Sequence, residues 1–192
     1  MQLSLIPQKH LGQIKARSHG GESLKKRRKT KRPLVPGLIT HVAFKSSKAK
    51  GDLSFYKHKK TVHSMLKTLS RKYFVEIQDF VNMGNHLHLK VKFKDTERFQ
   101  NFMRTFAGLL PRRLTHACKG QSFGRFWDGL AYTRVLVSRL EELGLRGYFE
   151  GNHRERELGL RERELYLKHF NQFLYRLRQR RAEPQGPGPI HP

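Results

Sequence analysis

Four segments of the chain have the apolar spacing of β-strands: residues 38–45, 73–81, 86–93 and 131–137. Three of them are rich in β-branched and aromatic residues. In the remaining segment, residues 86–93, apolar residues alternate strictly with histidine or lysine. Side chains of a strand point to opposite faces in turn, so its leucines and Val91 would share one face while His86, His88, Lys90 and Lys92 share the other. One face of this strand suits a core and the other suits chemistry.

Two segments between these strands have helical spacing instead. Val62, Met65, Leu66 and Leu69 predict a helix over residues 57–73. A phenylalanine-rich stripe predicts a second over residues 96–118, although Pro111 should kink or split it. Residues 83–85, "MGN", carry a turn signal that joins the second and third strands into a hairpin. The order β-α-β-β-α-β predicts a ferredoxin-like α+β domain, an antiparallel sheet with helices on one face, which by itself decides no function.

Two further helices are expected after the last strand. Residues 139–152 are amphipathic but carry Gly144, Gly147 and Gly151, each costing about 1 kcal/mol relative to alanine, so tertiary contacts must hold this helix. From residue 154 the sequence "RERELGL" is followed by "RERELYL", which is too short for a coiled coil and predicts a charged surface helix over residues 154–182. Its expected buried stripe is Leu160, Leu167, Phe170, Leu174 and Leu177.

The two ends of the chain lack this periodicity. Residues 1–36 are basic and glycine-rich, and residues 183–192 are rich in proline and glycine, so we expect both to be unstructured. The expected organisation is therefore a basic arm (1–36), a folded domain (37–153), a helix (154–182) and a tail (183–192).

The net charge of the chain narrows the class of binding partner. The 192 residues contain 40 Lys and Arg against 15 Asp and Glu, a net charge of +25, and 36% are hydrophobic, enough for one core. Such an excess favours a polyanion, with nucleic acid ahead of an anionic membrane surface. No apolar run approaches the roughly 18 residues of a membrane-spanning helix. The arm supplies a cluster of candidate phosphate contacts: Lys25, Lys26, Arg27, Arg28 and Lys29. A single cysteine, Cys118, excludes an intrachain disulfide and agrees with a reducing cytosol.

His86 and His88 are candidate ligands of one divalent metal, because neutral imidazoles two apart on a strand can reach the same ion. Lys90 and Lys92 continue the same face and would hold a phosphodiester beside it. The alternative is a pair of exposed strand histidines in a chain that contains 11.

Tyr148 and Asn152 lie four residues apart and so share one face of a helix. A tyrosine can act as a covalent nucleophile, and an amide oxygen suits Mg²⁺ or Mn²⁺. Spacing by itself favours the alternative, a packed helical tyrosine with an asparagine near a helix end. Arg125, Phe126 and Trp127 have the composition of a surface that stacks on unpaired bases, and core packing explains them equally well.

The run "MGNHLHLKV", with "FVEIQDFV" before it and "FGRFWDGLAYTRVLV" and "YFEGN" after it, resembles the single-tyrosine transposases of the His-hydrophobe-His class. It is most similar to the branch of REP-associated tyrosine transposases, over about residues 31–157. The resemblance implies metal ligands at His86, His88 and Asn152, with Mg²⁺ or Mn²⁺ as cofactor, and a nucleophile at Tyr148. It also implies nicking and rejoining of single-stranded or hairpin DNA through a 5′-phosphotyrosine. The protein would be a monomer or homodimer in the bacterial cytoplasm, associated with the nucleoid.

Some positions depart from that family's pattern. Gly84 stands where the family usually has proline, and no proline follows Asn152. Tyr132 and Tyr166 are other tyrosines, but Leu136 and Phe170 stand where a companion amide would be. Two alternatives remain at this point: a domesticated relative that binds DNA or RNA without cutting, and an electrostatic RNA-binding or ribosome-associated protein that uses the basic arm.

Overall fold

The computed structural model describes residues 17–21 and 31–182. The expected phosphate contacts Lys25, Lys26, Arg27, Arg28 and Lys29, and the expected tail 183–192, lie outside the described residues. The chain divides into two compact units, one up to Glu142 and one from Leu143 onward. No helix among the described residues has the length and apolarity needed to cross a membrane.

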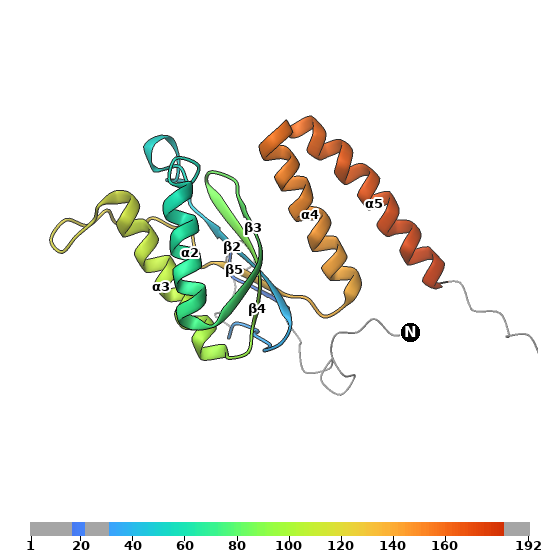
Figure 1. The fold of residues 1–192 in the computed structure, drawn as a ribbon, viewed down its shortest axis with the longest axis horizontal. Helices are drawn as coiled ribbons and strands as arrows, with labels where there is room; N and C mark the ends of the chain where they lie inside the picture. The colour runs from blue at the N-terminus through green and yellow to red at the C-terminus, as the bar shows by residue number, and fades with distance from the viewer. Residues whose placement is uncertain (1–16, 22–30, 183–192) are drawn as a thin grey trace, which may run out of the picture. The chain divides into compact units, whose positions relative to one another are not determined.

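A five-stranded antiparallel sheet forms the first unit (Figure 1). Its order is β1-β5-β2-β4-β3. The strands are β1 (Ser18–His19), β2 (Ile39–Lys45), β3 (Val75–Asn82), β4 (His86–Phe93) and β5 (Tyr132–Val135). Without β1, this is the ferredoxin-like arrangement that the order of the elements predicted, so the α+β fold class is confirmed.

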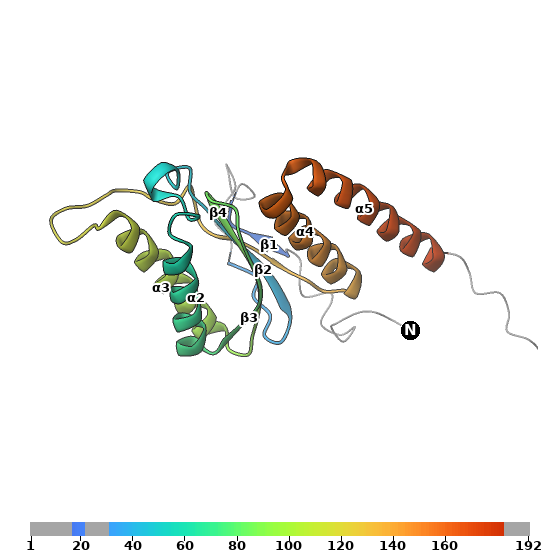
Figure 2. The same ribbon diagram turned by 45° about the horizontal axis from the view of Figure 1, so that its top comes forward.

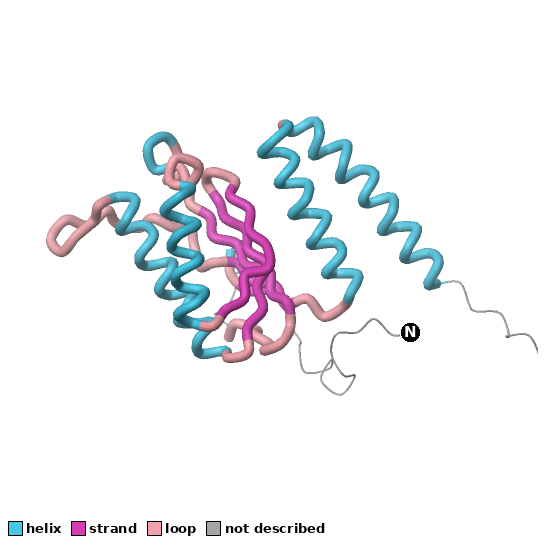
Figure 3. Tube along the Cα trace, in the orientation of Figure 1, coloured by secondary structure: helices cyan, strands magenta, loops and turns pink. Residues whose placement is uncertain are grey.

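Two helices, α2 (Lys59–Tyr73) and α3 (Thr96–Thr115), cover one face of the sheet (Figure 3). A short 3₁₀ turn, η2 (Gly51–Leu53), precedes α2. The apolar side of β4 is buried together with the phenylalanine stripe of α3, and the rings of Phe93 and Phe99 stack with their centroids 4.3 Å apart. The strict alternation of β4 therefore buries Leu87, Leu89 and Val91 and leaves its histidines on the opposite face of the sheet.

Helix α3 runs through Pro111 instead of splitting there. Proline has no N–H, so the carbonyl oxygen of Ala107, four residues earlier, loses its helical donor. The indole Nε1 of Trp127 donates to that oxygen at 2.7 Å. A side chain from outside the helix thus replaces the missing hydrogen bond, and α3 continues to Thr115.

Strand β1 lies within the segment expected to be an unstructured arm, which is a difference from the sequence analysis. Ser18 pairs with Arg134 and His19 with Thr133 at the edge of the sheet. Gly20 follows with φ +85°, and a Cβ on it would stand 2.1 Å from the carbonyl oxygen of Ala131. Only glycine permits this approach. Ser18 and His19 thus form an edge strand that pairs with β5, and Gly20 allows the close contact that follows it.

Two helices, α4 (Arg139–Leu158) and α5 (Leu160–Ala182), run side by side in opposite directions (Figure 2). They meet at Gly159, whose φ of +96° ends α4. The helix break expected near residue 153 lies instead at Gly159, because α4 continues to Leu158, into the first "RERELGL" copy. Leu160, expected to be buried, is the first residue of the second helix and is 60% exposed.

The three glycines of α4 explain how this pair packs. Antiparallel helices bring Gly144 beside Leu174, Gly147 beside Phe170 and Gly151 beside Leu167. A Cβ on Gly147 would stand 2.0 Å from the ring of Phe170, so the ring occupies the space that a side chain would need. The expectation that tertiary contacts hold a glycine-rich helix is confirmed.

Candidate active site

His86 and His88 lie next to each other on the face of β4 that points away from α2 and α3. Their ring centroids are 4.9 Å apart and the rings are nearly perpendicular, at 87°. His86 is partly exposed, whereas His88 is 6% exposed. The strand period brings the two predicted metal-ligand candidates together, as the sequence indicated.

The Nδ1 atom of each histidine has a hydrogen-bond partner. Nδ1 of His86 lies 2.6 Å from the carboxamide oxygen of Asn85. Nδ1 of His88 lies 3.1 Å from Nε2 of His41 on β2, and these two rings are stacked at an interplanar angle of 27°. Burial, together with the positive charge of Arg134, lowers the pKa of His41 to about 4, so its imidazole is neutral at physiological pH.

The turn before β4 sets the position of His86. Gly84 has φ +83°, a conformation closed to proline, whose ring fixes φ near about −65°. Its N–H donates to the side-chain oxygen of Asn82, and the amide nitrogen of Asn82 donates to the carbonyl oxygen of Phe55. These hydrogen bonds tie the turn at Gly84 to Asn82 and Phe55, and β4 begins two residues later, at His86.

Lys90 continues the face of β4 but is already paired with an acid. Its Nζ lies 3.1 Å from Glu142, and both side chains are mostly buried. Burial would raise the pKa of Glu142, but the hydrogen bond and charge of Lys90, with Arg139, outweigh it and hold that pKa below its ordinary value. Lys92, two residues along, is exposed. The predicted phosphate contact at Lys90 stays a prediction, and its charge is compensated in this structure.

Tyr132 also belongs to this part of the first unit. Its ring meets His41 edge-on, with centroids 5.8 Å apart. Arg134, on the same strand, pairs with Glu141 at 3.0 Å. Tyr132 is thus a tyrosine in contact with His41, and an experiment must distinguish it from Tyr148.

Tyr148 and Asn152 lie in the second unit, one turn apart on α4. Asn152 is 1% exposed, and its amide nitrogen has no hydrogen-bond partner within the part of the chain that the structure describes. Tyr166, the third candidate tyrosine, lies on α5 and stacks on Phe170. Burial raises the pKa of Tyr166, and the negative charge of Glu150 adds to the rise, which makes its hydroxyl harder to ionise.

The predicted metal ligands are two imidazoles and an amide, and they belong to different units of the chain. Among residues 17–21 and 31–182, no group of three or more His, Cys, Asp or Glu side chains is placed to hold a metal. His86 and His88 offer two adjacent imidazoles. In Asn152 the buried atom without a hydrogen-bond partner among the described residues is the amide nitrogen, which is a donor and not a metal ligand. Two imidazoles and an amide oxygen fit Mn²⁺ or Mg²⁺.

The loop after α3 is anchored to β2 and the core. Phe126 is buried, and its carbonyl oxygen accepts from Ser46 at 2.6 Å. The guanidinium of Arg125 donates to the carbonyl oxygens of Trp127 and Asp128. The structure therefore uses Phe126 and Trp127 for packing, while the predicted base contacts of Arg125, Phe126 and Trp127 stay predictions.

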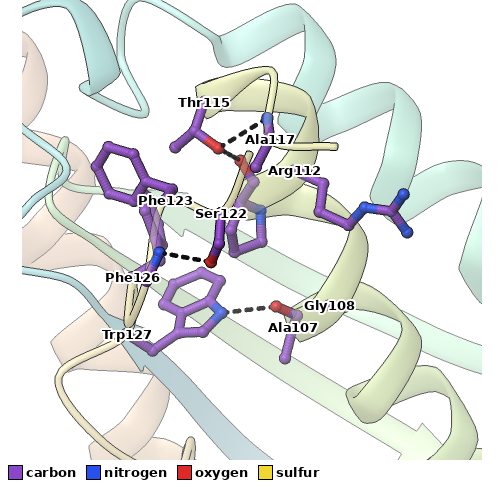
Figure 4. Close-up of a pocket in the computed structure, with 11 residues that line it drawn as sticks. Ala107, Gly108, Arg112, Thr115, Ala117, Ser122, Phe123, Phe126 and Trp127 are labelled. Atoms are coloured by element: carbon purple, nitrogen blue, oxygen red, sulfur yellow. Dashed lines mark hydrogen bonds between the residues drawn. The ribbon is translucent and has the colours of Figure 1, made fainter. Parts of the chain in front are cut away.

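A pocket of about 260 Å³ lies between this loop and α3 (Figure 4). Arg112 and Thr115 line it from the helix, and Ser122 and Phe123 line it from the loop. Phe123 is 40% exposed, so it is the ring of this loop that remains accessible for stacking.

Three residues around the histidines were missed by the sequence analysis: His41, Asn85 and Glu142. Asn85 adjoins His86 in the sequence, so the "NHLH" run contained a usable signal for it. His41 lies 47 residues from His88 and Glu142 lies 52 from Lys90. Their contacts depend on strand register and on where α4 starts, and neither follows from periodicity.

Comparisons with known proteins point to one family. A model of the family described as "Transposase IS200 like" matches residues 35–141, more than half of the chain. The match includes His41, His86 and His88 and ends before Tyr148 and Asn152. A search of the curated proteins found no match.

Two solved structures are similar to this chain. One, described as the REP-associated tyrosine transposase bound to a REP hairpin, has a TM-score of 0.51 and 12% identity, over 70% of this chain and 76% of that one. The other, a candidate transposase from Deinococcus radiodurans R1, has a TM-score of 0.41 and 17% identity, over 65% of this chain and 98% of that one. At such identities the first likeness is one of fold.

Proposed function

Because the chain belongs to the family of IS200-like transposases, we propose that it nicks and rejoins single-stranded or hairpin DNA with Tyr148 as nucleophile. The observation that carries the proposal is the histidine pair of β4, whose rings lie 4.9 Å apart inside the matched segment. A solved structure of similar fold is described as bound to a REP hairpin, which supports hairpin DNA as the substrate class.

The chemistry is a transesterification. The hydroxyl oxygen of Tyr148 forms a bond to phosphorus, the bond from phosphorus to the 3′-oxygen breaks, and the proton of the tyrosine ends on the released 3′-hydroxyl. The product is a 5′-phosphotyrosine that conserves the bond energy, so a 3′-hydroxyl can reverse the step without ATP. Tyr148 is favoured over Tyr132 and Tyr166 because Asn152 follows it by one helical turn.

His86, His88 and Asn152 would hold Mg²⁺ or Mn²⁺, which when bound polarises the scissile phosphate. The histidines would bind as neutral imidazoles, and Asn152 would contribute its amide oxygen. The histidines belong to the first unit and Asn152 and Tyr148 to the second, and the proposal assigns all four to the same reaction.

Attraction of DNA is assigned to other residues. The net charge of +25 is spread over the chain, and Lys92 is exposed on the strand of the histidines. Loss of a metal ligand should therefore stop cleavage while the DNA remains bound. We expect His86→Ala and His88→Ala to retain a labelled oligonucleotide in a filter assay yet form no adduct.

The decisive experiment follows the covalent adduct. Wild type and the Phe variants of Tyr148, Tyr132 and Tyr166 are incubated with labelled hairpin DNA and Mn²⁺, then separated on a denaturing gel. Tyr148→Phe removes one hydroxyl and keeps the ring, so the adduct should disappear while folding and DNA retention persist. The other two variants should still form it.

An adduct made by Tyr148→Phe but lost in Tyr132→Phe would move the nucleophile to β5, beside His41. No adduct from wild type on any hairpin substrate, with either metal, would reduce the protein to a DNA-binding member of its family.

A further inference from the structure

His41 reaches His88 from the neighbouring strand. In the β2–β4 ladder His41 stands opposite Lys90 and Ala43 stands opposite His88, so the two histidines are diagonal neighbours on one face of the sheet. Their stacked rings place Nε2 of His41 3.1 Å from Nδ1 of His88. A contact fixed by strand register in the middle of a sheet is not a chance meeting of flexible side chains.

A hydrogen bond between two imidazoles has one donor and one acceptor, so it selects a tautomer for each ring. If Nδ1 of His88 carries the proton, its Nε2 carries the lone pair that a metal needs. Histidine ligands commonly give their second N–H to an acceptor in this way, which fixes the ring and raises its basicity as a ligand.

His86 indicates which tautomer His88 should adopt. The carboxamide oxygen of Asn85 can only accept, so Nδ1 of His86, 2.6 Å away, must be the donor. The lone pair of His86 is then on Nε2. If His88 adopts the same tautomer, both histidines present the lone pair of Nε2 to the same ion. His41 is placed to impose that tautomer on His88.

We propose that His41 is a positioning residue: its Nε2 accepts the Nδ1–H of His88 and so holds His88 in the tautomer whose Nε2 binds the metal. His41 is itself held by its place in β2, between β4 and β5, and by the ring of Tyr132. The inference rests on the proposed role of His88 as a ligand, and every group it uses belongs to the first unit.

The tautomer can be measured without metal. In protein labelled with ¹⁵N-histidine, long-range proton–nitrogen spectra distinguish an imidazole protonated on Nδ1 from one protonated on Nε2. Wild-type His88 should be protonated on Nδ1. His41→Phe keeps a ring and removes the acceptor, so His88 should shift toward protonation on Nε2, whereas His41→Gln supplies an amide oxygen and should restore the wild-type form.

The affinity for Mn²⁺, measured by titration in the absence of DNA, is the second test. His41→Phe should weaken binding by about 10-fold or more, the usual effect of removing the partner of a histidine ligand, and His41→Gln should recover most of it. His63→Phe, at an exposed histidine on α2 across the core, is the matched control and should change neither measurement.

Several results would overturn the role of His41. They are a wild-type His88 protonated on Nε2, an unchanged tautomer in His41→Phe, or equal losses of affinity in the Phe and Gln variants. The wild-type tautomer decides even if a variant fails to fold. Wild-type protein that binds no Mn²⁺ would instead count against the metal in the proposed function, and the tautomer comparison would still decide what His41 does.

Discussion

At the scale of single residues, the pairing of Pro111 with Trp127 shows how this chain tolerates a proline near the end of a helix. The carbonyl oxygen of Ala107 loses a donor from its own helix and gains one from a loop residue 20 positions away. The exchange links α3 to the loop, so the loop's position depends on a defect in the helix. Trp127, which sequence composition made a candidate for base stacking, therefore has a structural task.

This exchange predicts a coupling between the two positions. Trp127→Phe leaves the oxygen of Ala107 without that donor and should lower the free energy of unfolding by about 1 kcal/mol or more. Pro111→Ala supplies a helical N–H to the same oxygen, so it should stabilise the Trp127→Phe protein more than it stabilises wild type. Urea unfolding of the four proteins measures the coupling. Strictly additive effects would show that the two donors do not replace each other.

What the sequence could tell about single residues depended on local spacing. His86 and His88 share a strand, and Tyr148 and Asn152 share a helix turn, so the two pairs were predictable from strand and helix geometry. His41 was not predictable, because a one-residue change of register between β2 and β4 would turn it to the other face. The compensation of Lys90 by Glu142 was hidden for a similar reason, since it depends on tertiary placement.

Among the elements, α4 has a low intrinsic helix propensity because of its glycines, and packing against α5 stabilises it. Gly147 and Gly151 let Phe170 and Leu167 approach the backbone of α4. This pairing replaces intrinsic helix propensity with packing against α5. The helix that carries Tyr148 thus depends on α5 for its stability.

Two alanine substitutions separate propensity from packing. Gly144→Ala places a Cβ 4.0 Å from Leu174, an ordinary contact, so it should stabilise the helix by up to about 1 kcal/mol. Gly147→Ala places a Cβ 2.0 Å from the ring of Phe170 and should destabilise the pair despite the same gain in propensity. Circular dichroism at rising temperature measures both. Stabilisation of equal size in the two variants would contradict the close packing.

Periodicity predicted the elements between residues 38 and 137 well, because each buries one face against a common core. It failed at the chain's edges. Strand β1 is two residues long, too short for any period to show, and depends on the space left by Gly20. The repeat that begins at residue 154 suggested one continuous helix, but Gly159, within the first copy, has a left-handed conformation and ends α4.

At the scale of the whole molecule, charge dominates: 40 basic residues stand against 15 acidic ones. Several basic side chains of the described part are used within the protein, as Lys90 and Arg134 are in their pairs with Glu142 and Glu141. Basic groups already paired inside the fold contribute less to the binding of phosphates. The arm's five consecutive basic residues are therefore strong candidates for sequence-independent affinity.

Neutralising that cluster should change the salt dependence of DNA binding. Lys25, Lys26, Arg27, Arg28 and Lys29 are replaced by Gln in the full chain, which keeps β1. For single-stranded DNA the slope of log affinity against log salt should become shallower by about 0.7 for each phosphate that the arm no longer neutralises. Specificity between a hairpin and an unrelated strand should change little. An unaltered slope would place the arm outside the DNA interface.

The hydrogen bond from Trp127 to Ala107 holds the indole ring in the first unit, so tryptophan fluorescence can report on that unit. Trp127 is the chain's single tryptophan, and its ring packs against Phe44, Phe55 and Phe126 of the first unit. Its fluorescence therefore follows the melting of the sheet and its two helices, while the far-ultraviolet helical signal also includes α4 and α5. The gap between the two transitions measures how far the tyrosine-bearing helices unfold independently of the histidine-bearing sheet.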